Sequence, residues 1–133
     1  VRVTGDCPLV NHESLDYVLK KCGSAQDFDL ATTKGSFPIG IDFEIYQSSA
    51  MKDLNNRKDL TDQDREHLTW YMVRQPDIFS HFQIEAPIEW KWKGRPFTVD
   101  TMEDLIWTRS VVEMAGGATA SIQEIIKSAN TFE

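Results

Sequence analysis

Residues 2–9 read Arg2-Val3-Thr4-Gly5-Asp6-Cys7-Pro8-Leu9, a strand-like segment that ends on an aspartate. Glycine lets the backbone turn and proline ends the pairing of a strand, so Asp6 is expected at the carboxyl end of a strand. Open α/β sheets place their ligand-binding groups at that edge. Residues 97–104 repeat the pattern of strand, aspartate and helix start, with Asp100 as the aspartate. Adjacent strands would bring Asp6 and Asp100 together to hold one divalent cation.

The composition is that of one ordinary globular domain. The chain has 133 residues, 41% of them hydrophobic, and residues 1–133 are expected to form a single domain. The net charge of −7 argues against a nucleic acid or an anionic membrane as partner, because both require a basic surface. The sequence contains no long apolar stretch and no basic-then-apolar leader, which predicts a soluble, cytoplasmic protein.

Two further features of the sequence concern its context. Cys7 and Cys22 match no spacing of a zinc or redox motif, so both are expected to be reduced. The chain begins at Val1, without methionine and inside a strand-like segment, which suggests a fragment of something longer.

Helix start signals recur along the chain. Asn11 can cap a helix whose residues 15, 18, 19 and 22 form an apolar face, with Gly23 just past its end. Residues 48–55 favour a short helix. A Thr or Ser followed three residues later by an acidic residue predicts helix starts at Thr61, Thr101 and Ser121, the first of these continuing through residue 72.

Strands are expected between these helices. Residues 27–32 favour a short strand, and the alternation of residues 39–46 predicts another, with Asp42 and Glu44 on one face. Residues 81–86 and 90–93 are expected to pair as an antiparallel hairpin. The interleaving of strands and helices predicts an α/β fold with a mixed sheet.

Several side chains could carry chemistry, and each has a simpler interpretation. Mg²⁺ usually takes one or two protein carboxylates and leaves its other positions to water and phosphates, which suits Asp6 and Asp100, although either aspartate could simply cap a helix. Asp42 and Glu44 could bind a polyhydroxylated substrate or lie on a solvated strand face. Residues 65–67 could form an acid, base and cation cluster or a polar surface. The motifs of serine hydrolases, P-loops and dinucleotide-binding folds are absent from the sequence.

Taken in order, four segments resemble the sugar-activating cytidylyltransferases, particularly the spore-coat polysaccharide branch related to the synthetases of CMP-activated sugar acids. The segments are residues 3–9, 37–44, 65–69 and 98–105. The resemblance runs over essentially the whole chain but covers only the carboxyl-terminal half of such an enzyme. It implies part of a mixed, mostly parallel, Rossmann-like sheet flanked by helices. The glycine-rich loop with which the family holds CTP has no counterpart in this sequence.

The resemblance also implies an activity and a site. It implies the transfer of CMP from CTP to a sugar or sugar acid for surface polysaccharide biosynthesis, with release of pyrophosphate, Mg²⁺ as cofactor and a possible homodimer. Asp6 and Asp100 are then the catalytic and metal-binding residues. The residues expected to bind the substrates are Gly40, Asp42, Glu44, Glu66 and His67.

Two other functions remain open from the sequence. The chain could be a non-catalytic piece, either truncated or serving in dimerisation or sugar binding, or it could be a glycosyltransferase that consumes a nucleotide-sugar. A glycosyltransferase would release a nucleoside diphosphate in place of pyrophosphate, and that product separates it from a cytidylyltransferase.

Overall fold

The structure is a computed structural model and describes residues 1–25 and 27–132. Its centre is a three-stranded sheet in the order β2-β1-β3. β1 pairs antiparallel with β2 and parallel with β3, so the sheet is mixed, as expected, and the α/β class is confirmed. The strands are β1 (Leu30–Thr32), β2 (Glu44–Tyr46) and β3 (His81–Gln83).

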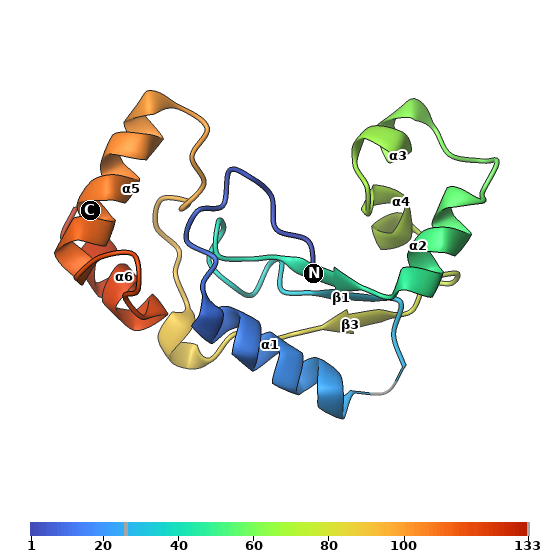
Figure 1. The fold of residues 1–133 in the computed structure, drawn as a ribbon, viewed down its shortest axis with the longest axis horizontal. Coiled ribbons are helices and arrows are strands. Elements are labelled where there is room, and N and C mark those ends of the chain that lie inside the picture. Colours follow the sequence, from blue (N-terminus) through green and yellow to red (C-terminus); the bar gives the residue numbers. More distant parts are fainter. Residues whose placement is uncertain (26, 133) are drawn as a thin grey trace.

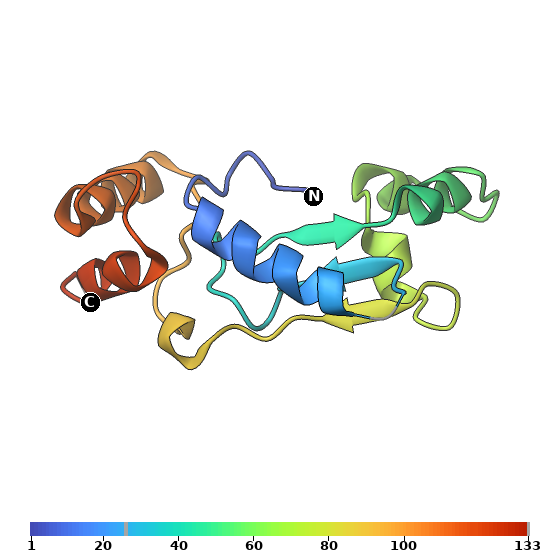
Figure 2. The same cartoon turned by 60° about the horizontal axis from the view of Figure 1, so that its bottom comes forward.

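The helices lie along one face of the sheet and at its two ends. α1 runs along the sheet, as Figure 2 shows most clearly. α2, α3 and α4 gather at one end of the molecule, and α5 and α6 at the other (Figure 1). The bounds are α1 (His12–Ser24), α2 (Ser48–Asn55), α3 (Asp62–Glu66), α4 (Trp70–Arg74), α5 (Met102–Ala115) and α6 (Ile122–Ala129), with a 3-10 helix η1 (Ile88–Trp90) between β3 and α5.

Neighbouring residues of β1 face two different hydrophobic cores. Leu30 packs with the smaller core, formed with α2, α4 and Phe79. Ala31 packs with the larger core, which joins α1, α5 and α6. This follows from the period of two along a strand, since successive side chains point to opposite faces of the sheet. The central strand therefore separates the two cores.

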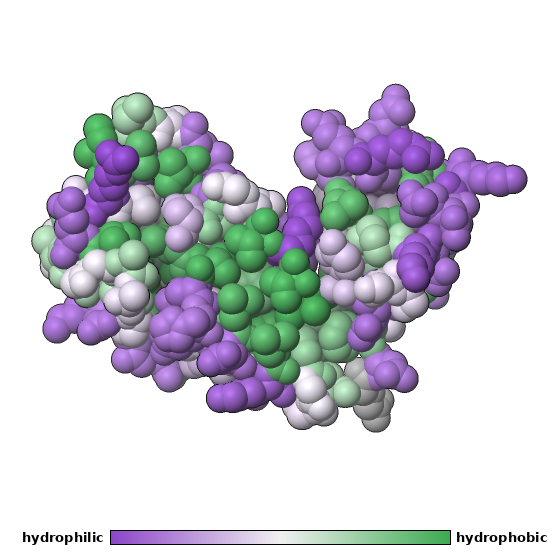
Figure 3. Space-filling model, viewed as in Figure 1, coloured by the Kyte–Doolittle hydropathy of each residue, from purple (hydrophilic) through white to green (hydrophobic). Residues whose placement is uncertain are grey.

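Some hydrophobic side chains are exposed on the surface. On the face shown in Figure 3, hydrophobic side chains gather over the middle of the molecule, and the end formed by α2–α4 is mostly hydrophilic. Leu19 of α1 is 50% exposed, so the expectation that it shares the buried face with Val18 is wrong. Among the described helices, none has the length and hydropathy needed to cross a membrane.

The expected helix starts are confirmed by four complete capping boxes. The N-cap residues are Asn11, Thr61, Thr101 and Ser121, and each accepts a hydrogen bond from the backbone of the third helical residue. In return, the side chain of that third residue accepts a hydrogen bond from the backbone N–H of the N-cap residue. Together the two bonds satisfy two backbone donors that would otherwise be unpaired. α1, however, extends through Gly23, which was expected to lie beyond its end.

Several expected strands are shorter or absent. The opening segment makes one bridge, Arg2 to Glu44, and then turns at Gly5 and Asp6, and residues 97–99 are likewise irregular. Residues 27–32 and 39–46 shorten to β1 and β2. The second shortens because Gly40 has a φ of +90° and donates its N–H to Asp42 Oδ1 over 2.8 Å, which closes a turn where the alternation predicted a strand.

Two other predictions are wrong. Residues 81–86 and 90–93 form no hairpin, because η1 follows Pro87 and β3 pairs with β1 instead. The helix expected from Thr61 through residue 72 is split into α3 and α4. The break coincides with Thr69, whose hydroxyl donates a hydrogen bond of 2.8 Å to buried Glu44, so a tertiary contact overrides the local helix pattern.

The start of α5 should lose stability at acidic pH. Hydrogen bonds from Arg95 and Thr101 hold the pKa of Asp104 at about 2. Because the folded-state pKa lies below the unfolded value, this contribution is present above about pH 4 and is lost as the pH falls toward 2. Urea unfolding at pH 7 and pH 3 is expected to show a smaller acid-induced loss for Asp104→Asn than for the wild type. An equal loss in both proteins would contradict this assignment.

Candidate active site

The two sequence-predicted aspartates lie on adjoining segments. The backbone N–H of Val99 donates a hydrogen bond of 2.8 Å to the carbonyl oxygen of Asp6. Neither segment is a strand, so a single backbone contact between two irregular segments takes the place of the expected strand pairing. Asp100 follows directly and is exposed, ahead of the capped start of α5. The chain therefore brings together two segments that lie far apart in sequence and that each carry an aspartate.

Gly40 supports this junction through its backbone. Phe97 donates its N–H to the carbonyl of Ile39 over 2.8 Å. A Cβ on Gly40 would lie 2.5 Å from the carbonyl carbon of Phe97 and 2.6 Å from the nitrogen of Thr98. These contacts are possible only without a side chain, so Gly40 fixes the path of the segment that leads to Asp100.

A cavity of about 160 Å³ lies beside Asp6. A hydrogen bond with Thr4 is the main cause that lowers the pKa of the Asp6 carboxyl, and the charge of Arg2 adds to it. Burial raises the pKa of the Cys7 thiol, which keeps this neighbour of Asp6 protonated and unreactive near neutral pH. The lining residues of this first cavity are Arg2, Thr4, Asp6, Cys7, Lys34, Ile39, Asp42, Phe43, Glu44 and Thr98.

Glu44 is a buried carboxylate with both oxygens engaged. Its side chain is 2% exposed. Oε2 accepts hydrogen bonds from Arg2 Nη1 over 3.1 Å and from Thr69 Oγ1 over 2.8 Å. Oε1 lies 3.5 Å from Lys34 Nζ. A buried charge is tolerated when it is paired and hydrogen-bonded, and here two cations and one hydroxyl supply that compensation.

A second cavity, of about 340 Å³, is also bordered by Glu44. It shares Arg2, Lys34 and Glu44 with the first cavity and is completed by residues of α3, α4 and the turn between them. Those residues are Gln63, His67, Thr69, Trp70 and Val73. The sheet and the α2–α4 end thus form the two walls of one polar cavity.

The sequence-predicted substrate residues are distributed unevenly around these cavities. Asp42 lines the first cavity, His67 the second and Glu44 both. Gly40 contributes backbone contacts, and Glu66 is exposed and lines neither of the two. Within the described ranges, no three His, Cys, Asp or Glu residues gather closely enough to form a metal site by themselves.

The lining residues that were not predicted from the sequence include Arg2, Lys34, Thr69 and Trp70. Each meets Glu44 or the second cavity through contacts between parts of the chain that lie far apart in sequence. The one signal that could have found Arg2 was its position four residues before Asp6, since strand alternation places both on the same face. Nothing in the local pattern indicates Lys34, Thr69 or Trp70.

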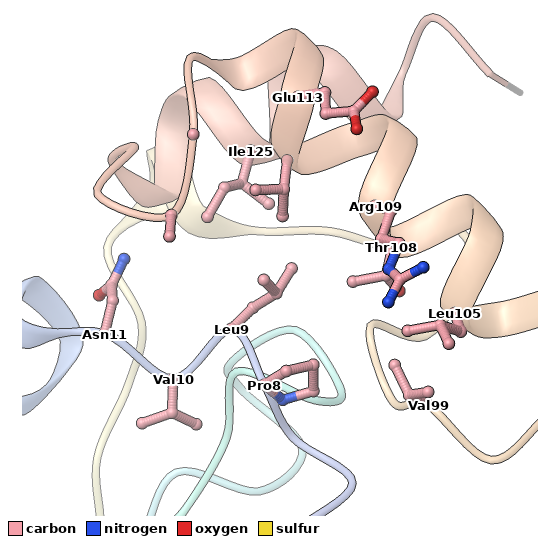
Figure 4. A pocket seen from close by; sticks show the side chains of 13 residues that line it. Pro8, Leu9, Val10, Asn11, Val99, Leu105, Thr108, Arg109, Glu113 and Ile125 are labelled. Carbon is pink, nitrogen blue, oxygen red and sulfur yellow. The ribbon is translucent and has the colours of Figure 1, made fainter.

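A third cavity, of about 420 Å³, is apolar and is lined in part by Pro8 and Val99 (Figure 4). Leu9 and Ile125 project into it, and Arg109 and Glu113 of α5 border it. The Thr108 hydroxyl is buried there without a hydrogen-bond partner among the described residues. Its lining lacks Asp6, Glu44 and His67, so this cavity offers few groups for catalysis despite its size.

Comparison with known proteins gave no matching family model, but it did give relatives. The chain is 35% identical over 109 residues to the uncharacterized protein MJ1063 of Methanocaldococcus jannaschii, which covers 78% of this chain and 42% of that protein. It is 29% identical over 119 residues to the spore coat polysaccharide biosynthesis protein SpsF of Bacillus subtilis, covering 87% of this chain and 48% of SpsF. The chain thus spans less than half the length of these two relatives.

A solved structure shares the fold. A cytidylyltransferase from Leptospira borgpetersenii superposes with a TM-score of 0.86 at 24% sequence identity. The match covers 98% of this chain and 55% of that one.

Proposed function

We propose that the chain is part of a cytidylyltransferase related to the spore coat polysaccharide biosynthesis protein SpsF, and that it takes part in transferring CMP from CTP to a sugar or sugar acid. The product would be a CMP-activated sugar for surface polysaccharide biosynthesis. Pyrophosphate would be released. The proposed catalytic residues are Asp6 and Asp100.

The observation that carries this proposal is the hydrogen bond between Val99 and Asp6. It joins two segments that are far apart in sequence, and both of them border one polar cavity, through Asp6 on the first segment and Thr98 on the second. Two aspartates that served only as helix caps would not require their segments to be joined in this way. Thr101 is already the N-cap of α5, so Asp100 is not needed for that role.

The donor set suits Mg²⁺. This ion prefers oxygen ligands and binds proteins through one or two carboxylates, with water and substrate phosphates in its other positions. Asp6 and Asp100 supply two carboxylates, and the lowered pKa of Asp6 keeps its carboxyl ionised. Bound there, Mg²⁺ would neutralise charge on the phosphates of CTP.

The remaining chemistry is a displacement at phosphorus. An oxygen of the acceptor forms a bond to the α-phosphorus, the bond from that phosphorus to the bridging oxygen of the β-phosphate breaks, and pyrophosphate leaves. His67 lines the second cavity, where the acceptor would lie, and a neutral imidazole can accept the proton of the attacking hydroxyl. Asp6 and Asp100 orient the nucleotide. Most of the catalytic effect would come from positioning and electrostatic stabilisation.

Calorimetric titration of the chain with CTP and MgCl₂ tests this proposal. Binding to the wild type is expected to depend on Mg²⁺ and to fall at least about tenfold in the double variant Asp6→Asn/Asp100→Asn, because each hydrogen-bonded charge contributes about 1.5–3 kcal/mol. The matched control is Asp16→Asn/Asp77→Asn, which removes two exposed carboxylates elsewhere and should bind as the wild type does.

The same titration can contradict the proposal in two ways. Absence of Mg²⁺-dependent binding by the wild type would do so, as would equal binding by the two double variants. With an acceptor sugar present, release of a nucleoside diphosphate in place of pyrophosphate would favour a glycosyltransferase instead.

A further inference from the structure

The two polar cavities share one wall, made of Arg2, Lys34 and Glu44. Asp6 lines one of these cavities and His67 lines the other. In the proposed reaction the nucleotide phosphates occupy the first cavity and the acceptor occupies the second. The α-phosphorus and the attacking oxygen must then meet beside the shared wall.

The shared wall carries the positive charge of both cavities. Among the described residues that line them, Arg2 is the one arginine and Lys34 the one lysine. Against the single charge of Glu44 they leave a net charge of about +1 in a chain whose net charge is −7. A phosphoryl group bound in this region would therefore be attracted by the charges of Arg2 and Lys34, in addition to any bound metal ion.

Glu44 fixes the position of these cations and leaves donors available. Within the described part of the chain, the Arg2 guanidinium makes one side-chain hydrogen bond, through Nη1, and a guanidinium has five N–H donors. The Lys34 side chain is 56% exposed, and its Nζ lies 3.5 Å from Glu44, so its ammonium can hold a second anion at the same time. A cation needed only to neutralise Glu44 would not have to line both cavities.

We propose that Arg2 and Lys34, held by Glu44, form an anion site that binds a phosphoryl group between the two cavities. The site rests on the proposed function for its role, in which the bound group is the α-phosphate of CTP. Arg2 and Lys34 donate hydrogen bonds to the non-bridging oxygens of that phosphate. They stabilise the charge that develops there as the acceptor oxygen approaches. Glu44 is a positioning residue and touches neither substrate.

Inorganic phosphate in the presence of EDTA is a probe that needs neither metal nor nucleotide. Titration of the full chain, followed by ¹H–¹⁵N NMR, is expected to shift the amide signals around Arg2, Lys34 and Glu44. The dissociation constant for phosphate should rise at least about tenfold in Arg2→Gln and in Lys34→Gln, since each removes a charged hydrogen bond.

The control variants remove the same charge elsewhere. Arg109→Gln and Lys20→Gln change exposed side chains outside the two polar cavities, and each should keep the dissociation constant within about twofold of the wild type. Equal losses in all four variants would show a general effect of net charge and overturn the proposal. The proposal would also be overturned if phosphate shifted amide signals only in another region, or if phosphate did not bind at all.

The phosphate titration and the CTP titration can give opposite results, so the anion site and the proposed function are tested separately. Phosphate binding that depends on Arg2 and Lys34, without any Mg²⁺-dependent binding of CTP, would support the anion site and contradict the transferase. Mg²⁺-dependent binding of CTP without phosphate binding would support the transferase and contradict the anion site.

Discussion

Replacing Gly40 by alanine is expected to lower the free energy of unfolding by about 3 kcal/mol or more, as measured by urea denaturation. Two costs combine at this position. The φ of +90° is strained for any residue with a Cβ, at about 1–2 kcal/mol. The new Cβ would also lie 2.5 Å from the backbone of Phe97, where no flexible side chain can move aside.

Gly35 provides the control that separates these two costs. Its φ is +80°, but a Cβ there would meet nothing within 4 Å. Gly35→Ala should therefore show the conformational cost alone, about 1–2 kcal/mol. Similar losses in the two variants would show that the approach to Phe97 is not what fixes Gly40. A variant of Gly40 that stays folded should also lose Mg²⁺-dependent binding of CTP, because the shifted backbone leads to Asp100.

Replacing Glu44 by alanine is expected to cost about 3 kcal/mol of unfolding free energy. The carboxylate is buried and accepts hydrogen bonds from Arg2 and Thr69. Its removal leaves the Thr69 hydroxyl, in a residue only 4% exposed, without its acceptor and opens a space between β2 and α4. Arg2 and Lys34 can still reach water, which limits the loss to a few kcal/mol.

Glu85 is the matched control for Glu44. It also pairs with a lysine, Lys91, but its side chain is 72% exposed. Exposed ion pairs contribute about 0–1 kcal/mol, so Glu85→Ala should have a small effect. A loss for Glu44→Ala no greater than that for Glu85→Ala would show that the buried cluster contributes little to stability.

The parts of the fold that the sequence predicted are those determined by neighbouring residues. Capping boxes at Thr61, Thr101 and Ser121 set helix starts within three residues, and the structure contains all of them. The burial of Ile122 and Ile125 in α6 likewise follows from helical periodicity. Such features are predictable because each depends on a short stretch of chain.

The errors arose where distant contacts decide the conformation. Residues 39–41 alternate as a strand would, but Gly40 turns there because it lies against Phe97, 57 positions further on (97 − 40). Thr69 interrupts a helix pattern to reach Glu44. The candidate site also combines predictable and unpredictable parts. Asp6 and Asp100 lie in recognisable local motifs, whereas the Arg2–Glu44–Lys34 cluster depends on contacts between distant residues.

Two cores on opposite faces of β1 allow the protein to open in parts. Among the described residues, the core under α2 and α4 contains six buried hydrophobic residues, far fewer than the core of α1, α5 and α6. Regions with fewer buried contacts exchange their amide hydrogens at lower opening free energies than the rest of a domain. The α2–α4 end is therefore expected to open at a lower free energy than the remainder of the molecule. Since that end carries Gln63, His67 and Trp70, its opening rate would set how quickly a bound acceptor enters and leaves.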